Sequence, residues 1–292
     1  MLVRLDNVLA PAKLNLFLHI TGVREDGYHL LQSAFVMIDW CDVLHFEVRT
    51  NSSAITREDI TQPLPAEDLI VRAARLLQQA AGVVRGVHIR IEKNIPAEAG
   101  LGGGSSDAAS TLLALNQLWG LHWSREQLQQ IGVQLGADVP FFIGGTNAWV
   151  EGIGEKLTPL VGPLALPDAR FLVIKPQAGL STAQIFSHPL LNKESACARI
   201  TDFAAMPYEF GLNALQRVAE VLCPEVKKII YFLKGRKLRA IMTGSGSAVF
   251  AKINNSVSGD EIDALIVDIK DVFVGSEVRV CAGLFKHPFG GV

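Results

Sequence analysis

The chain has 292 residues, and its 27 lysine and arginine side chains nearly balance its 29 aspartates and glutamates, giving a formal net charge of −2. A charge this close to neutral predicts no strong attraction to nucleic acid or to an anionic membrane surface. Hydrophobic residues make up 49% of the chain, enough for a large core. At this length two domains are expected.

Cysteine usage and the N-terminal segment predict a cytoplasmic protein. The cysteines are far apart and form no CxxC pair: Cys41, Cys197, Cys223 and Cys281. We expect reduced thiols and no zinc site. The beginning of the chain carries charges and lacks the apolar region of a signal peptide, and no apolar run approaches the length of a membrane span. The histidines form no HExxH pair, so we expect them to be structural rather than metal ligands.

The first half of the chain alternates between strand and helix patterns. Short apolar runs predict strands at 14–20, 44–49 and 86–93. Apolar residues spaced along one helical face predict helices at 66–81, 105–120 and 124–136. Gly120 is placed to end the second of these helices.

The second half begins near residue 160, where prolines interrupt the pattern and a domain boundary is expected. Beyond it the sequence predicts a strand at 170–176, a helix at 211–222, a strand–loop–strand unit at 239–253 and a helix at 259–270. Basic residues gather at 227–239, which is typical of a solvated helix end followed by a turn and a strand. Because strands and helices mix without strict alternation, the expected fold class is α+β.

A glycine-rich stretch stands between the strand at 86–93 and the helix at 105–120. Residues 95–111 read IPAEAGLGGGSSDAAST. Backbone N–H groups that converge at a helix start make an anion site, which favours phosphate binding here. A flexible loop followed by a serine N-cap is the competing interpretation. The stretch is neither a Walker A loop nor a GxGxxG motif, because no Lys-Ser or Lys-Thr pair and no suitably spaced acid follow it.

Two more motifs accompany this loop. PAKLNLFLHITGVREDGYHLLQSAF lies at 11–35, and MTGSGSAVFA lies at 242–251. In order and spacing the three motifs resemble those of the GHMP kinases, a superfamily of small-molecule kinases. The segments KLNLFLHITGVREDGYH, LGADVPFFIGGTNAWVEGIGEKLTPL (135–160) and KPQAGLSTAQIF (175–186) are similar to one branch of it, and the resemblance runs over almost the whole chain.

The resemblance implies an α+β fold of two domains, 1–160 with the glycine-rich phosphate loop and 161–292, with the active site in the cleft between them. It also implies an enzyme: an ATP-dependent kinase that phosphorylates the 2-hydroxyl of 4-diphosphocytidyl-2-C-methyl-D-erythritol on the non-mevalonate route to isoprenoid precursors. Mg²⁺ is the expected counter-charge on the phosphates. A GHMP kinase for another small alcohol, such as homoserine or mevalonate, and a non-catalytic nucleotide sensor are the alternatives.

Two residues are assigned to catalysis by the resemblance. Asp138 of GADVP matches the base that accepts the proton of the attacking hydroxyl. Without the resemblance, its sequence context would favour an aspartate in a turn or at a helix end. Lys13 of PAKLNL matches the amine that holds the acceptor and offsets developing negative charge. Without the resemblance, a lysine at this place would be expected at the edge of a strand with its amine in solvent.

The resemblance assigns the remaining site residues to two groups. The substrate group has Tyr28 and Phe186 stacking on the cytosine and His29 at its polar edge; its members are Asn15, Tyr28, His29, Lys175, Thr182 and Phe186. The ATP group is Asp68, Lys93, Pro96, Gly100, Leu101, Gly102, Gly103, Gly104, Ser105 and Ser106. We expect Asp68 and the backbone near Lys93 to face the adenine. The sequence identifies no metal ligands, although Ser105 and Ser106 are candidates.

The chain departs from the usual pattern of the superfamily branch at five positions. Asp68 replaces an asparagine that can both donate and accept, and Glu98 adds an anion close to the phosphate site. Ala214 and Gln216 stand where acidic residues are common, and Ser247 stands where proline is frequent.

Overall fold

The computed structural model describes residues 3–254 and 256–290. Its strands are β1 (Arg4–Val23), β2 (His29–Arg49), β3 (Ile55–Asp59), β4 (Gly86–Glu92), β5 (Ala148–Gly152), β6 (Lys156–Pro159), β7 (Arg170–Lys175), β8 (Ala240–Met242), β9 (Val249–Ile253) and β10 (Glu277–Leu284). Its helices are α1 (Leu69–Ala80), α2 (Gly103–Trp119), α3 (Arg125–Gly132), α4 (Val139–Gly144), α5 (Thr182–Ser187), α6 (Ile200–Ala205), α7 (Gln216–Leu222), α8 (Pro224–Gly235) and α9 (Gly259–Val272), with a 3-10 turn at Gly162–Leu164.

The strands form one sheet in the order β3-β4-β2-β10-β7-β9-β8, and β1 and β5 also pair with β2. Strand β10 joins the two halves of the chain. It pairs with β7 from Glu277 to Ala282, and its last two residues then pair with β2. The C-terminal strand therefore returns to the half of the molecule that holds β1 and β2.

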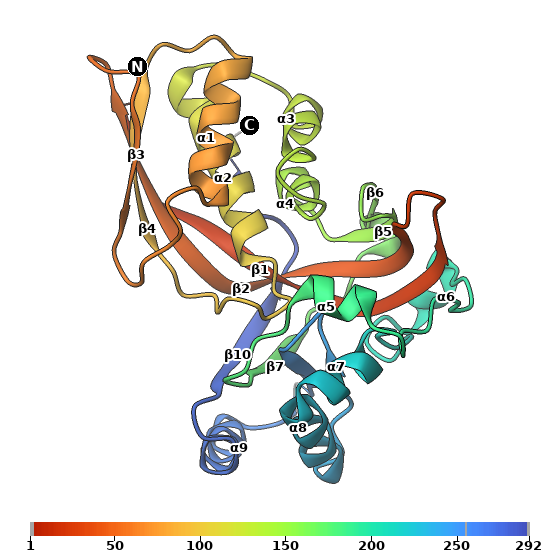
Figure 1. The fold of residues 1–292 in the computed structure, drawn as a ribbon. Helices are drawn as coiled ribbons and strands as arrows, with labels where there is room; N and C mark the ends of the chain where they lie inside the picture. Colours follow the sequence, from red (N-terminus) through yellow and green to blue (C-terminus); the bar gives the residue numbers. More distant parts are fainter. Residues whose placement is uncertain (1–2, 255, 291–292) are drawn as a thin grey trace.

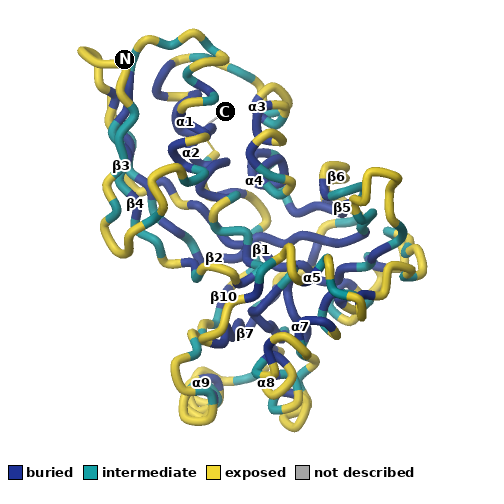
Figure 2. The backbone as a smooth tube through the Cα atoms, viewed as in Figure 1, coloured by how far each residue is buried: buried dark blue, intermediate teal, exposed yellow. Residues whose placement is uncertain are grey.

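Helices cover the sheet in two groups (Figure 1). Helices α1 to α4 lie together beside β1 to β4, while α7, α8 and α9 lie beside β7 and β10. Buried residues run through the centre of both parts, and exposed ones follow the outer helices and loops (Figure 2). Mixed strands and helices in this arrangement confirm the predicted α+β class.

Most predicted elements are present, with shifted ends. The strand expected at 14–20 is the middle of the 20-residue strand β1. Gly120 ends α2 with a positive φ of 65°, as predicted. The helix expected at 211–222 begins only at Gln216, because the preceding backbone pairs with Leu18 of β1 instead: the Leu18 N–H donates to Leu212 and the Leu18 carbonyl accepts from Ala214.

The basic segment 227–239 is a helix end, a turn and the approach to a strand, as the charge pattern indicated. Helix α8 ends at Gly235 and β8 begins at Ala240. Arg236 pairs with Asp268 at 2.9 Å, and Arg239 donates to the carbonyl oxygen of Gly211 at 2.5 Å. These contacts make the segment part of the packing between α8, α9 and the loop before α7.

Candidate active site

One cavity of about 1340 Å³ opens between β1, the start of α2, the start of α4 and α5. Of the predicted site residues, only Lys175, Ser105 and Ser106 do not line it. Those that do are Lys13, Asn15, Tyr28, His29, Asp68, Lys93, Pro96, Gly100, Leu101, Gly102, Gly103, Gly104, Asp138, Thr182 and Phe186. Segments from both halves of the sequence therefore meet at this cavity.

Helix α2 starts at the cavity wall. Its N-cap is Gly102 in the left-handed region, φ 71°, and no side chain of the described residues caps it. The first acceptor inside the helix is the Gly102 carbonyl, which binds the Ser106 N–H at 2.9 Å. The N–H groups of the first turn thus have no acceptor within the helix, and the helix dipole adds positive potential. Because the cap is a glycine and both serines lie inside the helix, the serine N-cap interpretation is wrong.

The three motifs noted in the sequence are tied together by backbone contacts. The Lys13 N–H donates to the Leu101 carbonyl oxygen at 2.9 Å, and the Ala248 N–H donates to that of Ala99 at 3.1 Å. A Cβ added at Gly100 would collide with the carbonyl oxygen of Thr243, so this glycine is required for the close approach of the two loops.

Lys13 and Asp138 lie next to each other at the cavity wall, with Lys13 Nζ 3.4 Å from Asp138 Oδ2. Lys13 is only 4% exposed, so the interpretation as an edge lysine with a solvated amine is wrong. Its amine also donates to Asn15 Oδ1 and lies 4.6 Å from the centre of the Phe35 ring. Asp138 stands at the N-cap of α4, yet among the described residues its side chain makes no cap hydrogen bond. The amine of Lys13 is therefore held in place by its neighbours, while the carboxylate of Asp138 is not used to cap α4.

The wall near α5 carries aromatic and polar groups. Tyr28 is 60% exposed. The His29 ring centre lies 5.1 Å from that of Phe186, and burial, followed by the charge of Lys193, lowers the pKa of His29 and favours its neutral form. His29 Nε2 is buried and has no hydrogen-bond partner within residues 3–254 and 256–290. This wall therefore offers ring faces together with an unsatisfied nitrogen.

Lys175 lies behind this wall. It is 5% exposed, and its amine donates to the carbonyl oxygens of Pro176 at 2.7 Å and Ala178 at 3.1 Å. Thr182 lines the cavity, and its hydroxyl lies 2.8 Å from that of Ser245. Lys175 thus fixes the backbone that leads into α5.

The opposite wall is formed by the segment before α1 and by the end of β4. Asp68 caps α1 by accepting the Val71 N–H at 3.1 Å, and it forms an ion pair with Arg57 at 2.6 Å. The Lys93 N–H donates to Thr61 Oγ1 at 2.8 Å, and that hydroxyl donates to the Lys93 carbonyl at 3.1 Å. A base could accept the Lys93 N–H only after Thr61 has moved away, whereas the carbonyl oxygen keeps a second lone pair. The sequence did not indicate this restriction.

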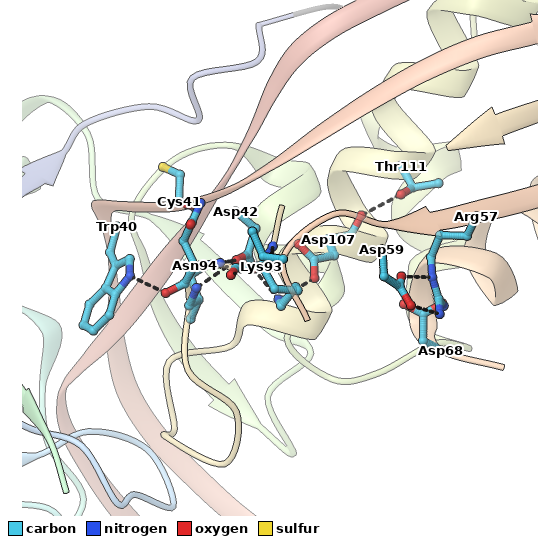
Figure 3. A network of polar contacts seen from close by, with 12 residues as sticks. Trp40, Cys41, Asp42, Arg57, Asp59, Asp68, Lys93, Asn94, Asp107 and Thr111 are labelled. Atoms are coloured by element: carbon cyan, nitrogen blue, oxygen red, sulfur yellow. Dashed lines mark hydrogen bonds and ion pairs between the residues drawn. The ribbon is translucent and has the colours of Figure 1, made fainter. Parts of the chain in front are cut away.

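A buried charge cluster lies behind the start of α2 (Figure 3). The Lys93 amine pairs with Asp42 and, at 2.7 Å, with Asp107 of α2. Burial alone would lower the pKa of Lys93, but the two carboxylates outweigh it and raise that pKa. Burial also raises the pKa of Asp107 well above its ordinary value. The side chain of Lys93 thus joins β2, β4 and α2.

Glu98, one of the departures from the superfamily pattern, introduces a carboxylate into the cavity wall. Its φ of 50° lies in the left-handed region, and its side chain packs directly on Gly179. The sequence missed Arg57, Thr61 and Thr243 as neighbours of the site. Thr243 could have been found from its place in MTGSGS, whereas nothing marked Arg57.

Two family models match the chain: GHMP kinases N terminal domain over residues 68–146, and GHMP kinases C terminal over residues 194–262. These matches, together with the single cavity that the motifs share, show that the protein is a GHMP kinase, an enzyme that phosphorylates a small molecule. A homoserine kinase from Cytophaga hutchinsonii superposes with a TM-score of 0.70 at 15% identity, covering 98% of this chain and 95% of its own, which shows the common fold alone.

Closer relatives specify the branch. A 4-diphosphocytidyl-2-C-methyl-D-erythritol kinase from Acidovorax sp. (strain JS42) is 59% identical over 97% of this chain and 96% of its own length. One from Paracidovorax citrulli (strain AAC00-1) is 56% identical over 98% and 97%. A crystal structure of 4-(cytidine 5'-diphospho)-2C-methyl-D-erythritol kinase matches with a TM-score of 0.77 and 34% identity, covering 94% of this chain and 98% of that one. The chain belongs to the family of 4-diphosphocytidyl-2-C-methyl-D-erythritol kinases.

Proposed function

We propose that this enzyme transfers the γ-phosphoryl group of ATP to the 2-hydroxyl of 4-diphosphocytidyl-2-C-methyl-D-erythritol, a step on the non-mevalonate route to isoprenoid precursors. The observation that carries the proposal is the 59% identity, over 97% of the chain, to a relative named 4-diphosphocytidyl-2-C-methyl-D-erythritol kinase. The cavity supports it, because the proposed catalytic pair, phosphate site and aromatic wall all line one space.

Asp138 is the proposed base. Phosphoryl transfer through a loose transition state needs mainly positioning and charge stabilisation, and a hydroxyl nucleophile gains from a carboxylate that accepts its proton. Asp138 is suited to this because its side chain is 29% exposed at the cavity. Lys13, fixed between Asn15 and Asp138, would hold the acceptor oxygen and offset negative charge as the phosphoryl group moves.

The triphosphate is proposed to lie on the N–H groups at the start of α2, between Gly102, Gly103 and Gly104. The base would then lie toward Asp68, Lys93 and Pro96, which line the same wall.

For Mg²⁺ the start of α2 offers serine hydroxyls rather than a cluster of carboxylates. Among the residues that the structure describes, no three His, Cys, Asp or Glu side chains gather around a point that could hold a metal. Ser106 Oγ, in the first turn of α2, is buried and has no partner in the described chain, and neither Ser105 nor Ser106 lines the cavity, so these hydroxyls would have to turn toward the phosphate oxygens before they could hold the ion. The ion would supply counter-charge to the phosphates.

The acceptor is proposed to occupy the wall near α5. Its cytosine would stack between Tyr28 and Phe186, with His29 at the polar edge and Thr182 beside it, since a pyrimidine offers two ring faces and a hydrogen-bonding edge. Lys175 would act from behind by fixing the backbone before α5.

We further propose a two-domain organisation and a cytoplasmic location for the protein. We take 1–160 and 161–292 as the two domains, with β10 returning to the first. No helix in the described part of the chain has the length and apolar character needed to cross a membrane. A cytoplasmic location is supported by four cysteines that are all free thiols.

The experiment is a comparison of phosphoryl acceptors with the purified enzyme. ATP consumption is measured with 4-diphosphocytidyl-2-C-methyl-D-erythritol, mevalonate and homoserine in parallel. Consumption with the first acceptor alone supports the proposal. Faster turnover of mevalonate or homoserine would assign the enzyme to another acceptor, and no turnover with any of them would favour a nucleotide-sensing module.

A further inference from the structure

The guanidinium of Arg57, on β3, contacts one short segment, residues 59–68, and Figure 3 shows its contacts with Asp59 and Asp68. Its Nε donates to Asp59 Oδ1 at 2.6 Å, and one terminal nitrogen donates to Asp59 Oδ2 at 3.1 Å. The same nitrogen reaches the Leu64 carbonyl oxygen at 3.1 Å. The other terminal nitrogen binds the Pro65 carbonyl oxygen at 3.1 Å and Asp68 Oδ1 at 2.6 Å. Four hydrogen bonds and one ion pair therefore occupy all three nitrogens of the guanidinium.

The segment that Arg57 holds is a wall of the cavity, while Arg57 itself is not. Leu64, Pro65 and Asp68 all line the cavity. The Arg57 side chain is only 7% exposed and lies behind them. Asp59 closes the arrangement, because its Oδ2 also accepts the Leu64 N–H at 2.9 Å. Residues 59–68 otherwise form no helix and, beyond the end of β3, no strand. Their shape therefore depends on these side-chain contacts.

Asp68 receives a defined orientation from the same contacts. Its Oδ1 accepts from both Arg57 and the Val71 N–H, so one oxygen is fixed between the guanidinium and the start of α1. The positive charge of Arg57 offsets the carboxylate that would otherwise stand alone beside a bound nucleotide. This pairing bears on the departure at position 68, where the superfamily branch commonly has an uncharged amide.

We propose that Arg57 is a positioning residue for the nucleotide base: it shapes residues 59–68 and orients Asp68, and it thereby sets the affinity for ATP without touching it. The inference rests on the proposed function, which places the base at this wall. Arg57 lies outside the cavity that contains Lys13 and Asp138, so its loss affects nucleotide binding and leaves the chemical step unchanged.

Arg57→Lys is the sharpest perturbation, because lysine keeps the charge but cannot offer five donors in a planar fork. Arg199→Lys is the matched control: Arg199 also makes two side-chain hydrogen bonds to an aspartate, Asp202 of α6, at 3.1 and 2.9 Å, but this pair is exposed and neither residue lines the cavity. Asp59→Asn is a second variant, in case Arg57→Lys is poorly folded; it keeps the size of the side chain but removes its charge and turns one of its two acceptor oxygens into a donor. The dissociation constant of a non-hydrolysable ATP analogue is measured by calorimetry, and kcat and KM are measured for both substrates.

Arg57→Lys should raise the dissociation constant and the KM for ATP about tenfold or more, the scale of one or two lost hydrogen bonds. Asp59→Asn should raise them about threefold. The kcat and the KM for the acceptor should stay within about twofold of the unmodified enzyme, and Arg199→Lys should change nothing. Unchanged ATP affinity in both Arg57→Lys and Asp59→Asn, or an equal loss of kcat, would overturn the inference. If the unmodified enzyme fails to bind the ATP analogue at all, it is the proposed function that fails.

Discussion

His287 provides a test of how the end of the chain is fixed to the first half. The residue is 5% exposed, and its backbone N–H donates to the Gly145 carbonyl oxygen at 2.9 Å, at the end of α4. Its Nε2 lies 3.4 Å from Ser110 Oγ, and its Nδ1 accepts the Phe289 N–H at 3.1 Å. Burial, with a smaller contribution from the charge of Arg125, lowers the pKa of His287 to about 4.

The pKa shift converts into a dependence of stability on pH. In the unfolded chain a histidine has a pKa of about 6.5. As the pH falls below that value, the unfolded state binds a proton that the folded state refuses, so stability is lost between pH 6.5 and about 4. Between pH 7 and pH 5 this one group should cost about 2 kcal/mol, and about 3 kcal/mol once both states are protonated.

Urea unfolding of the unmodified protein and of His287→Gln, each at pH 7 and pH 5, measures this. Other groups titrate in both proteins, so the difference between the two pH dependences isolates His287. The unmodified protein should lose about 2 kcal/mol more than the variant over this interval. Equal losses in both proteins would refute the reasoning, because His287 would then be protonated in the folded state without penalty.

The remaining predictions concern the cavity. Asp138→Asn and Lys13→Ala should each lower kcat by roughly 10²–10⁴-fold while the unfolding transition is retained; an Asp138→Asn enzyme with more than about half the normal kcat would exclude Asp138 as the base. Tyr28→Ala and Phe186→Ala should each weaken CDP binding by about 1–3 kcal/mol in a titration, and unchanged affinity in both would exclude the stacking arrangement. Asp68→Asn keeps the oxygen that Arg57 and the Val71 N–H contact and adds a donor toward the base, so it should lower the KM for ATP by at most about tenfold and leave kcat alone; initial rates with ATP and GTP check this, and a preference of the unmodified enzyme for GTP would contradict it.

The long periodic elements could be predicted from the sequence because their signals are local. The helix at 105–120 has an apolar face and a terminal glycine, and α2 ends at Gly120 as expected. Helices α5 and α6 have six residues each, too few for a periodic pattern to emerge. Strand β10 was missed because what defines it is pairing with β2 and β7, which lie far away in the sequence.

The composition of the cavity was more predictable than its internal contacts. All the residues named from the motifs except Lys175, Ser105 and Ser106 line one cavity, because motifs mark positions in a shared fold. The contacts that these residues make with one another and with their neighbours could not be predicted from the sequence. Asp68 was considered as a lone carboxylate facing a base, and its pairing with Arg57 joins residues from separate elements. Likewise, the hydroxyl of Thr61 covers the backbone of Lys93 across a sequence separation that no local pattern reports.

A crystal structure with a non-hydrolysable ATP analogue and the cytidine-bearing acceptor bound together tests the central claim most directly. The account predicts the triphosphate at the start of α2, the cytosine between Tyr28 and Phe186, and the acceptor hydroxyl within hydrogen-bond distance of Asp138. A cytidine group bound at the wall of Asp68, or an acceptor hydroxyl remote from Asp138 and Lys13, would contradict it.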